Sequence, residues 1–494
     1  MRNGSDGLSR RRFVELAAGS VGAVALACTG KDAERATMPE RQVRRARPLF
    51  GEPVPDPAEV IDLPPGFRYR VLSETGSRLE GGGTVPGEHD GMAAFRGPGG
   101  TTVVIRNHEL NSGEGGEVPG RHPFDPAQPG GTIALEVGPD RRLVRQYVTS
   151  SGSRDNCAGG ATPWGTWLTC EESILPGHGY VFEVDPSQPE SRLSRTPIRA
   201  MGRFSHEAAG VDRATGIVYL TEDDFFGSAA ADPRRDTLYS FLYRFLPNDR
   251  TPRPGALLAG GRLQVLTADE APADADLARP RQRFVTRWLD VEADDPNAAG
   301  RKLHALRFNR LEGAHFAGGA FWFADTLGGE ERLGQIFRYS PAQASLELFY
   351  EGTKGSQMES PDNVGVTPWG DLWFAEDETE TSKGDARNRV MGITPEGAVY
   401  PFAINRLGSA EVAGPAFSPD GKTWFLNIQS AGLTLAIWGP FPKPSRTRRT
   451  RLSRAAPPPG LGPRLSGDLI ETARRWSTSP LEVAALDRLG VPLA

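Results

Sequence analysis

The chain has 494 residues, of which 59 are glycine and 42 are proline, and its formal net charge at pH 7 is -5. Such a content of turn-forming residues disfavours long helical bundles, and the length suits two average domains or one large β-architecture. Basic residues are concentrated near the N-terminus and between Lys443 and Arg454, so the rest of the chain is more acidic than the total suggests. An acidic body argues against nucleic acid as a partner.

The N-terminal residues have the pattern of an export signal. Arg10, Arg11 and Arg12 precede an apolar, uncharged run from Ala17 to Ala27, which is the order of a twin-arginine signal peptide. The run is about half of the roughly 20 residues that a membrane-spanning helix needs. We therefore predict a signal peptide over residues 1–27, recognition by the twin-arginine translocase, no stable membrane span, and a periplasmic or extracellular location.

Two fates are open for the end of this signal. Ala25-Leu26-Ala27 suits ordinary signal peptidase, but it also places Cys28 where a lipid-modified cysteine would stand. Simple cleavage is favoured, because lipoprotein signals prefer Leu where this chain has Ala25, and lipid anchoring through Cys28 stays open. Residues 28–56 are expected to form an N-terminal linker. Export in the folded state favours a protein that is loaded with metal before it leaves the cytoplasm.

The middle of the chain repeats itself. The run Thr162–Glu172 (TPWGTWLTCEE) aligns without a gap with Thr367–Asp377 (TPWGDLWFAED), and looser copies begin at Gly100, Gly216, Gly319 and Gly421. Each copy has a glycine, a short apolar or aromatic strand and a polar residue at its end. Copies spaced by about 50 residues are typical of propeller blades. We predict an all-β, six-bladed β-propeller over residues 57–441, with a central metal-binding channel.

A second polar element precedes each copy. In chain order these elements are His89-Asp90-Gly91, Asp155-Asn156-Cys157, His206-Glu207, Arg310–Gly313, Asp362-Asn363 and Glu411–Gly414. The segment Phe226–His304 is interpreted as an insertion between blades. Residues 442–494 are predicted to be a basic, Pro-rich linker and a short helical tail, in which Ser479 is the N-cap and Pro480 the first helical residue.

Polar residues at the ends of innermost propeller strands converge near the axis, so this pattern predicts a ring of carboxylates in the channel. Such a ring requires cations, and Ca²⁺ takes about six to eight oxygen ligands. The tryptophans of the repeats, at 164, 167, 322, 369, 373 and 424, are expected in the core. The channel carboxylates are Glu109, Glu171, Glu172, Glu207, Glu222, Asp223, Glu312, Asp325, Asp362, Glu376, Asp377 and Glu411.

Three other residues bear on the chemistry. Cys157 lies in a Gly-rich loop and is a candidate thiolate ligand for a softer or more highly charged metal. A disulfide between Cys157 and Cys170 is the rival interpretation in an oxidising compartment. Arg310 would be repelled by a polycationic centre unless an anion lay between them, and phosphate fits that position.

Several of these motifs together resemble the PhoX-type alkaline phosphatases. They are Asn107–Leu110, Asn156–Gly160, Thr162–Glu172, Thr221–Asp223, Arg310–Gly313 and Pro361–Asn363, and the similarity extends from about Asn107 to Phe441. The resemblance implies a six-bladed propeller whose channel binds Fe³⁺ and Ca²⁺. It also implies hydrolysis of phosphate monoesters, with a small phosphorylated molecule as substrate, and twin-arginine export.

The same resemblance implies roles for single residues. Cys157 would be the thiolate ligand of iron, while Arg310 and Asn107 would hold the phosphate. Whether Glu171 or Glu172 is a metal ligand stays open. The other metal carboxylates would be Glu222, Asp223, Glu312, Asp362 and Glu376.

Two alternatives remain. A calcium-dependent lactonase or esterase propeller needs one metal and few carboxylates, so the number of carboxylates argues against it. In a non-catalytic binding propeller, calcium would only hold the blades together and Arg310 would be a salt-bridge partner.

Overall fold

The computed structural model describes residues 49–443 except 112, 114, 225–238, 269–273, 276–277, 355–357 and 378–386. The predicted signal peptide, Cys28 and the predicted C-terminal helix lie outside the described residues. Within the described part, no helix is both long enough and apolar enough to cross a membrane.

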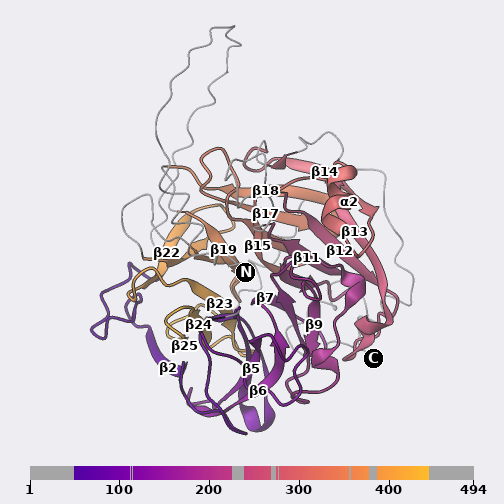
Figure 1. Ribbon diagram of the computed structural model, residues 1–494. Coiled ribbons are helices and arrows are strands. Elements are labelled where there is room, and N and C mark those ends of the chain that lie inside the picture. Colours follow the sequence, from indigo (N-terminus) through magenta and orange to yellow (C-terminus); the bar gives the residue numbers. More distant parts are fainter. Residues whose placement is uncertain are drawn as a thin grey trace, which may run out of the picture.

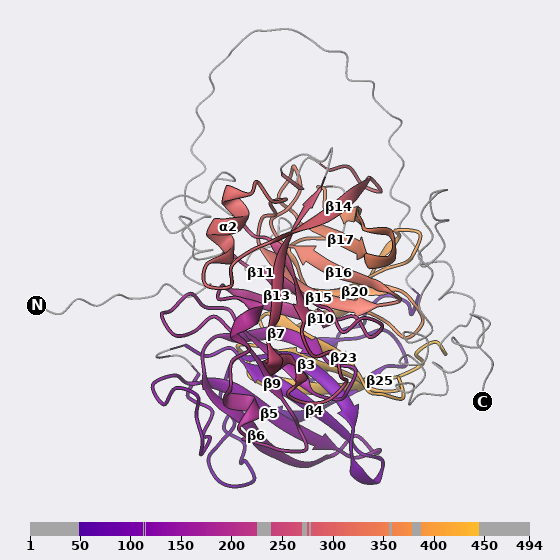
Figure 2. The same cartoon turned by 90° about the vertical axis from the view of Figure 1, so that its right-hand side faces the viewer.

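The described strands form antiparallel sheets around a common centre (Figure 1). The first sheet contains β3 (His89–Arg96), β4 (Thr102–His108), β5 (Gly130–Val137) and β6 (Leu143–Ser153). The second contains β7 (Asn156–Ala161), β8 (Trp167–Glu171) and β9 (Val181–Val184). In both views the sheet of β5 and β6 lies across the molecule from β14 and β17 (Figure 2).

The third sheet has nine strands. One run is β10 (His206–Val211), β11 (Val218–Glu222), β12 (Leu242–Pro247) and β13 (Gly261–Ala268). The other is β15 (Leu311–Ala317), β16 (Ala320–Asp325), β17 (Gln335–Ser340) and β18 (Ser345–Glu351). Strand β14 (Arg283–Asp290) pairs with β13 and with β18, and thereby covers both sheet edges.

The last two sheets include strands from the N-terminal side of the chain. One contains β19 (Pro361–Val366), β20 (Leu372–Glu376), β21 (Arg389–Ile393), β22 (Val399–Asn405) and β1 (Ile61–Asp62). The other contains β23 (Val412–Phe417), β24 (Trp424–Ile428), β25 (Leu433–Trp438) and β2 (Arg68–Glu74). Because β2 pairs with β25, backbone hydrogen bonds join the N-terminal and C-terminal parts of the described chain in one sheet.

The all-β, propeller-like fold predicted from the repeats is confirmed, and the described part contains few helices. They are α2 (Pro296–Lys302) and the 3₁₀ turns η1 (Pro98–Gly100), η2 (Leu193–Arg195), η3 (Arg199–Met201), η6 (Ala256–Ala259) and η8 (Pro341–Gln343). The described strands form five sheets and not six separate ones, because β14 joins two four-stranded runs into one sheet. The interpretation of Phe226–His304 as an insertion is also wrong in part, since β12, β13 and β14 continue the sheet.

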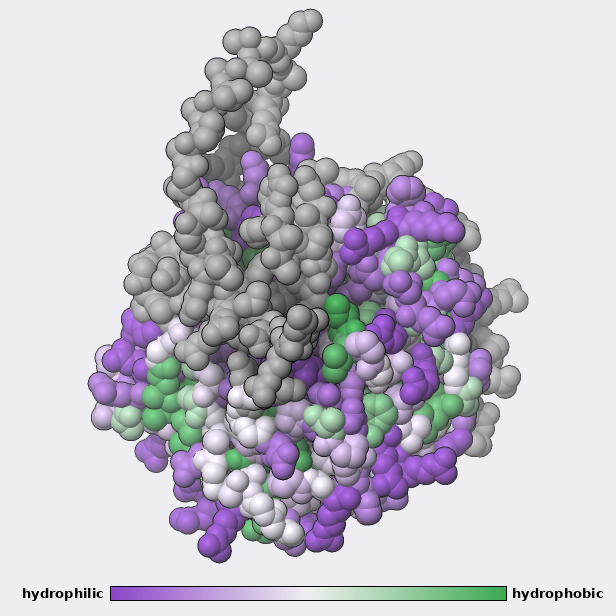
Figure 3. All heavy atoms as spheres, viewed as in Figure 1, coloured by the Kyte–Doolittle hydropathy of each residue, from purple (hydrophilic) through white to green (hydrophobic). Residues whose placement is uncertain are grey.

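The second strand of each repeat is an apolar run that is buried on both faces. Strands β8, β16, β20 and β24 are buried along their whole length, as expected for strands covered by neighbouring sheets. Trp369, Trp373 and Trp424 are at most 2% exposed. Phe50, in the predicted linker, packs with its ring centroid 5.2 Å from that of Phe67 and 5.8 Å from that of Trp369. The outer surface in Figure 3 is mostly hydrophilic, with hydrophobic residues in small groups.

The innermost strands follow one another around the centre. β3 contacts β7, β7 contacts β10, β10 contacts β15, β15 contacts β19, β19 contacts β23, and β23 contacts β3 again. Each has a β-bulge near its start, between His89 and Met92, Asn156 and Gly159, His206 and Ala209, Leu311 and Ala314, Pro361 and Val364, and Ala413 and Ala416. Two inner-strand residues there oppose one residue of the neighbour, which bends the strand and turns a side chain.

Glycine at one bulge position allows neighbouring inner strands to approach closely. A Cβ atom on Gly313 would lie 2.6 Å from Asn363 Cα and 2.9 Å from Asp362 O. We expect Gly313→Ala to lower the free energy of unfolding by about 1–3 kcal/mol through overpacking. Gly365→Ala is the matched control, because a Cβ there meets nothing within 4 Å. Urea unfolding of both variants measures the difference, and equal stabilities would contradict this account of the strand packing.

Candidate metal centre

Seven side chains near the bulges form three overlapping groups that could hold metal ions. Within each group the ligand atoms lie within 4.8 Å of one another. The groups are Cys157–Glu172–Glu207, Glu207–Glu312–Asp362 and Asp362–Asp377–Glu411, and every member is buried except the half-buried Asp377. Because Glu207 and Asp362 each belong to two groups, the seven residues form one continuous set, called here the channel cluster.

The bulges place four members of the channel cluster. Cys157, Glu207, Glu312 and Asp362 each occupy the second position of an innermost strand, inside the bulge. The same irregularity therefore presents a candidate metal-ligating side chain from each of four neighbouring strands. Asp90 occupies the equivalent position in β3.

Strand alternation distinguishes Glu171 from Glu172. Glu171 is the last residue of β8, and its carboxylate accepts hydrogen bonds from the backbone N–H groups of Gly179 (2.9 Å) and Tyr180 (3.1 Å). Glu172 follows immediately and belongs to the channel cluster. Since successive side chains of a strand point to opposite sides, only one of the two can face the channel cluster.

Two other predicted ligands, Glu222 and Glu376, likewise have their carboxylates engaged by other residues and lie behind the cluster. Glu222, at the end of β11, accepts hydrogen bonds from Phe241 N (3.1 Å) and from the Tyr243 hydroxyl (2.9 Å). Glu376, at the end of β20, lies 2.6 Å from Arg389 Nε. The structure does not bring Glu222 or Glu376 into the three groups.

Arg310 lies beside the cluster and is paired with two carboxylates. Its Nη2 is 2.7 Å from Asp223 Oδ2 and 2.9 Å from Glu312 Oε1. Its backbone is left-handed, with φ of 68°, a conformation that costs energy for a residue other than glycine and is concentrated at functional sites. Left-handed residues also directly precede three other innermost strands, namely Glu88, Asp155 and Ser360.

Asn107, predicted to hold phosphate, is fully buried between strands. Its Nδ2 donates to Cys157 O (2.9 Å) and Ala158 O (2.8 Å), and its Oδ1 accepts from Trp167 Nε1 (2.8 Å) and Thr169 Oγ1 (3.0 Å). These contacts occupy both ends of the amide. The structure therefore places Asn107 as an anchor for the bulge that carries Cys157.

The pKa values of two cluster residues, Cys157 and Glu411, indicate that their charged forms require positive charge nearby. Burial raises the pKa of the Cys157 thiol well above its usual range, and the carboxylates of Glu207 and Glu172 raise it further. Burial likewise raises the pKa of Glu411, together with the charges of Asp377 and Asp362. Both groups are thus unfavourable in their charged forms without cations, although a ligand must be charged to bind metal well.

The donor set fits metal ions. Carboxylate oxygens are the ligands of hard cations, and a thiolate suits softer metals and iron. Asp362 Oδ1 is a buried oxygen without a hydrogen-bond donor among the described residues. Cys157 and Cys170 are both free thiols, so the structure contradicts the rival disulfide and leaves Cys157 available as a ligand.

Sequence reasoning placed Glu207, Asp377 and Glu411 in the channel but did not name them as ligands. A signal for Glu207 was present, because it has the same place in its repeat as Cys157 and Asp362. Glu109 and Asp90 are two further carboxylates beside the cluster. Gln429 Nε2 donates a hydrogen bond to Glu109 Oε2 (2.7 Å) and one to Asp90 Oδ2 (3.2 Å).

The family model of the alkaline phosphatase PhoX matches residues 49–137 and 130–432. The chain belongs to the PhoX alkaline phosphatase family. It is therefore a phosphatase, as the resemblance implied, and membership implies dependence on metal. The lactonase and the non-catalytic binding propeller are not favoured.

Similarity to one solved structure supports the fold, and a second similarity is weaker. Pseudomonas fluorescens PhoX, solved in complex with vanadate, is 20% identical over 78% of this chain and 97% of its own, with a TM-score of 0.61. XC5397 from Xanthomonas campestris, a gluconolactonase, is 13% identical over 79% of this chain and 98% of its own, with a TM-score of 0.43. No curated protein matches this chain.

His178 lies behind the cluster and makes stability depend on pH. Its Nδ1 is 2.7 Å from Glu171 Oε1 and its Nε2 is 3.3 Å from Asp125 Oδ2. Burial lowers the pKa of His178, but the two carboxylates outweigh it and the pKa is raised. The folded state therefore favours the protonated ring, and this stabilisation is complete below about pH 6.5 and lost as pH rises through the raised pKa.

We expect the wild-type Tm to fall more steeply than that of His178→Gln as pH rises from about 6 to about 9. Scanning calorimetry at fixed metal concentration measures both slopes. His304→Gln, at an exposed site, is the control and should follow the wild type. Parallel slopes for wild type and His178→Gln would exclude His178 as the titrating group.

Proposed function

We propose that this protein is a phosphomonoesterase whose channel cluster binds Fe³⁺ and Ca²⁺ and whose Arg310 binds the phosphate of a small phosphorylated substrate. The observation that supports it best is the channel cluster itself, a continuous set of six carboxylates and one thiol that is buried except for the half-buried Asp377. Pseudomonas fluorescens PhoX was solved with vanadate, a transition state analogue, which supports phosphoryl chemistry for the family.

The cluster offers two kinds of metal environment. Cys157, Glu172 and Glu207 would hold iron, because this group alone contains sulfur. Glu312, Asp362, Asp377 and Glu411 offer only oxygen and would hold calcium. When bound, such ions neutralise and polarise the phosphoryl oxygens.

The protein's own residues would position the substrate. Arg310 Nε and Nη2 both donate to the Asp223 carboxylate, at 3.1 and 2.7 Å, so Asp223 fixes the plane of the guanidinium. A planar guanidinium of fixed orientation suits two-point recognition of phosphate. In this proposal Asp223 orients Arg310, while Glu171, Glu222 and Glu376 stabilise the strands behind the cluster and Asn107 holds the Cys157 backbone.

The remaining architecture follows from the same interpretation. We count six blades, because six bulged innermost strands surround the centre and the nine-stranded sheet contains two four-stranded runs linked by β14. We also propose twin-arginine export of the folded, metal-loaded protein to a location outside the cytoplasm, on the basis of Arg10–Arg12 and the apolar run that follows.

Hydrolysis of p-nitrophenyl phosphate by the metal-loaded protein tests the proposal. We expect turnover that a chelator abolishes and that added calcium restores where iron is retained. Metal analysis of the same sample should find both metals. A folded, metal-loaded protein without turnover would sink the phosphatase assignment, and calcium without iron would refute the role of Cys157.

A pair of variants tests whether the channel cluster binds the metal while the carboxylates behind it do not. Glu207→Gln should lower kcat/KM by at least about 100-fold and reduce bound metal, because Glu207 belongs to two groups. Glu222→Gln should keep its metal content, since its carboxylate serves Phe241 N and the Tyr243 hydroxyl. Equal metal loss in the two folded variants would contradict this division.

A further inference from the structure

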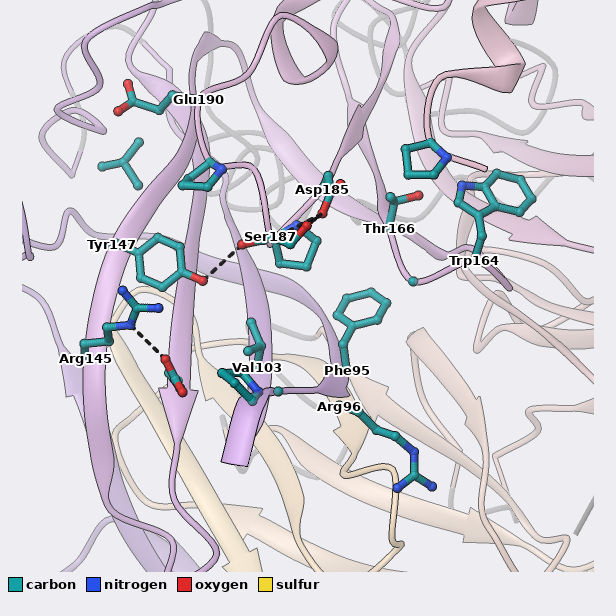
Figure 4. A pocket seen from close by; sticks show the side chains of 18 of the residues that line it. Phe95, Arg96, Val103, Arg145, Tyr147, Trp164, Thr166, Asp185, Ser187 and Glu190 are labelled. Atoms are coloured by element: carbon teal, nitrogen blue, oxygen red, sulfur yellow. Dashed lines mark hydrogen bonds and ion pairs between the residues drawn. The ribbon is translucent and has the colours of Figure 1, made fainter. Parts of the chain in front are cut away.

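A cavity of about 1880 Å³ lies at the ends of β7 and β8 that are remote from Cys157 and Glu172 (Figure 4). Trp164, which was expected in the core, borders this cavity, and no residue of the channel cluster does. Four carboxylates and four guanidinium groups line it, so its charge selects neither a cation nor an anion. The features that bear on the substrate lie at the other ends of the same strands.

At the cluster end, the loop Ser173–Gly179 begins directly after the cluster residue Glu172. Its second and third residues are Ile174 and Leu175. Because each residue spans at most about 3.6 Å of chain, the Cα atoms of Ile174 and Leu175 lie within about 7 and 11 Å of that of Glu172. A molecule bound at the cluster is therefore within reach of this loop.

A second segment that carries a cluster residue holds the loop in place. The Arg203 guanidinium donates through Nη2 to Ile174 O (2.6 Å) and Leu175 O (3.1 Å). The segment that follows Arg203 pairs with Glu172 and leads to Glu207 in β10. Both carbonyl groups of the loop are thus engaged between two strands of the metal centre.

The tip of the loop is a tight turn. His178 N donates to Leu175 O (2.9 Å) across Pro176 and Gly177, and Gly177 has a φ of 92°. Proline followed by a left-handed glycine is the signature of a type II turn. The ring of His178 is held in turn by Glu171, 2.7 Å away, so the conformation of the loop is fixed at both ends of this turn.

This fixed loop exposes hydrocarbon to solvent. The exposed fractions of Ile174 and Leu175 are 51% and 38%. Among the large apolar residues that are exposed in the described part of the chain, these two are the only ones adjacent in sequence. Single exposed apolar side chains need no explanation, but a pair on an ordered loop beside a metal centre is the arrangement of a binding surface.

We propose that Ile174 and Leu175 form an apolar lip that contacts the alcohol part of the substrate, so that the enzyme prefers phosphate monoesters of apolar alcohols. This inference rests on the proposed function, in which the phosphate is bound at the channel cluster and Arg310. The alcohol is bonded directly to the phosphate, so its first carbon atoms come nearest the lip. Contact with the lip removes part of their apolar surface from water.

Hydrolysis of ethyl, butyl and hexyl phosphate by the metal-loaded protein tests this proposal. The three alcohols have nearly equal acidity, so their esters differ in apolar length and not in reactivity. A fully buried methylene group contributes about fourfold to binding, and contact on one side about twofold. We therefore expect kcat/KM for hexyl phosphate to exceed that for ethyl phosphate by about tenfold.

The double variant Ile174→Ser/Leu175→Ser should lower this ratio to about twofold or less. Val144→Ser is the matched control and should keep the wild-type ratio, because Val144 is 59% exposed on β6, the outermost strand of its sheet. Both rate constants come from one preparation, so a smaller folded fraction in a variant leaves the ratio unchanged.

The outcomes separate this inference from the proposed function. Equal kcat/KM for the three esters in the wild type would overturn the apolar lip and leave the phosphatase assignment intact. The same dependence on chain length in the wild type and the double variant would also overturn it. A folded, metal-loaded wild type that hydrolyses none of the esters would overturn both.

Discussion

Repulsion among buried carboxylates is the constraint on which the rest of this structure depends. Two like charges 4.8 Å apart repel by about 3 kcal/mol at an effective dielectric constant of about 20, and Glu411 faces Asp377, Asp362 and Asp90 together. Protonation can relieve this repulsion in the empty site, and cations relieve it in the loaded one. Burial and this repulsion together raise the pKa of Glu411, as expected of carboxylates that are gathered where cations can bind.

Holding such a cluster requires a rigid scaffold and local strain. The fully buried strands β8, β16, β20 and β24 supply the rigidity, because displacing them would expose a large apolar area. The bulges and the left-handed residues before them supply the strain. Arg310 shows the relation clearly, since its left-handed backbone sets its guanidinium between Asp223 and Glu312.

The sequence was sufficient for the repeats, the strands and the region of the site, because each rests on local pattern. It could not separate Glu171 from Glu172 or rank Glu207 above Glu222. The first choice depends on which side of β8 lies against the cluster, and the second on where a bulge breaks the alternation of side chains between consecutive strands. The merging of two sheets was unpredictable because it rests on distant pairing, since β14 pairs with β13 next to it and also with β18 far along the chain.

The two ends of the inner strands obey different physical rules. At one end, backbone irregularity turns polar side chains inward, where a single changed carboxylate alters the charge balance of the whole cluster. At the other, turns such as Pro163–Thr166 are more exposed, and their side chains can change without disturbing that balance. Because buried strands connect the two ends, the exposed turns and the channel cluster can vary independently.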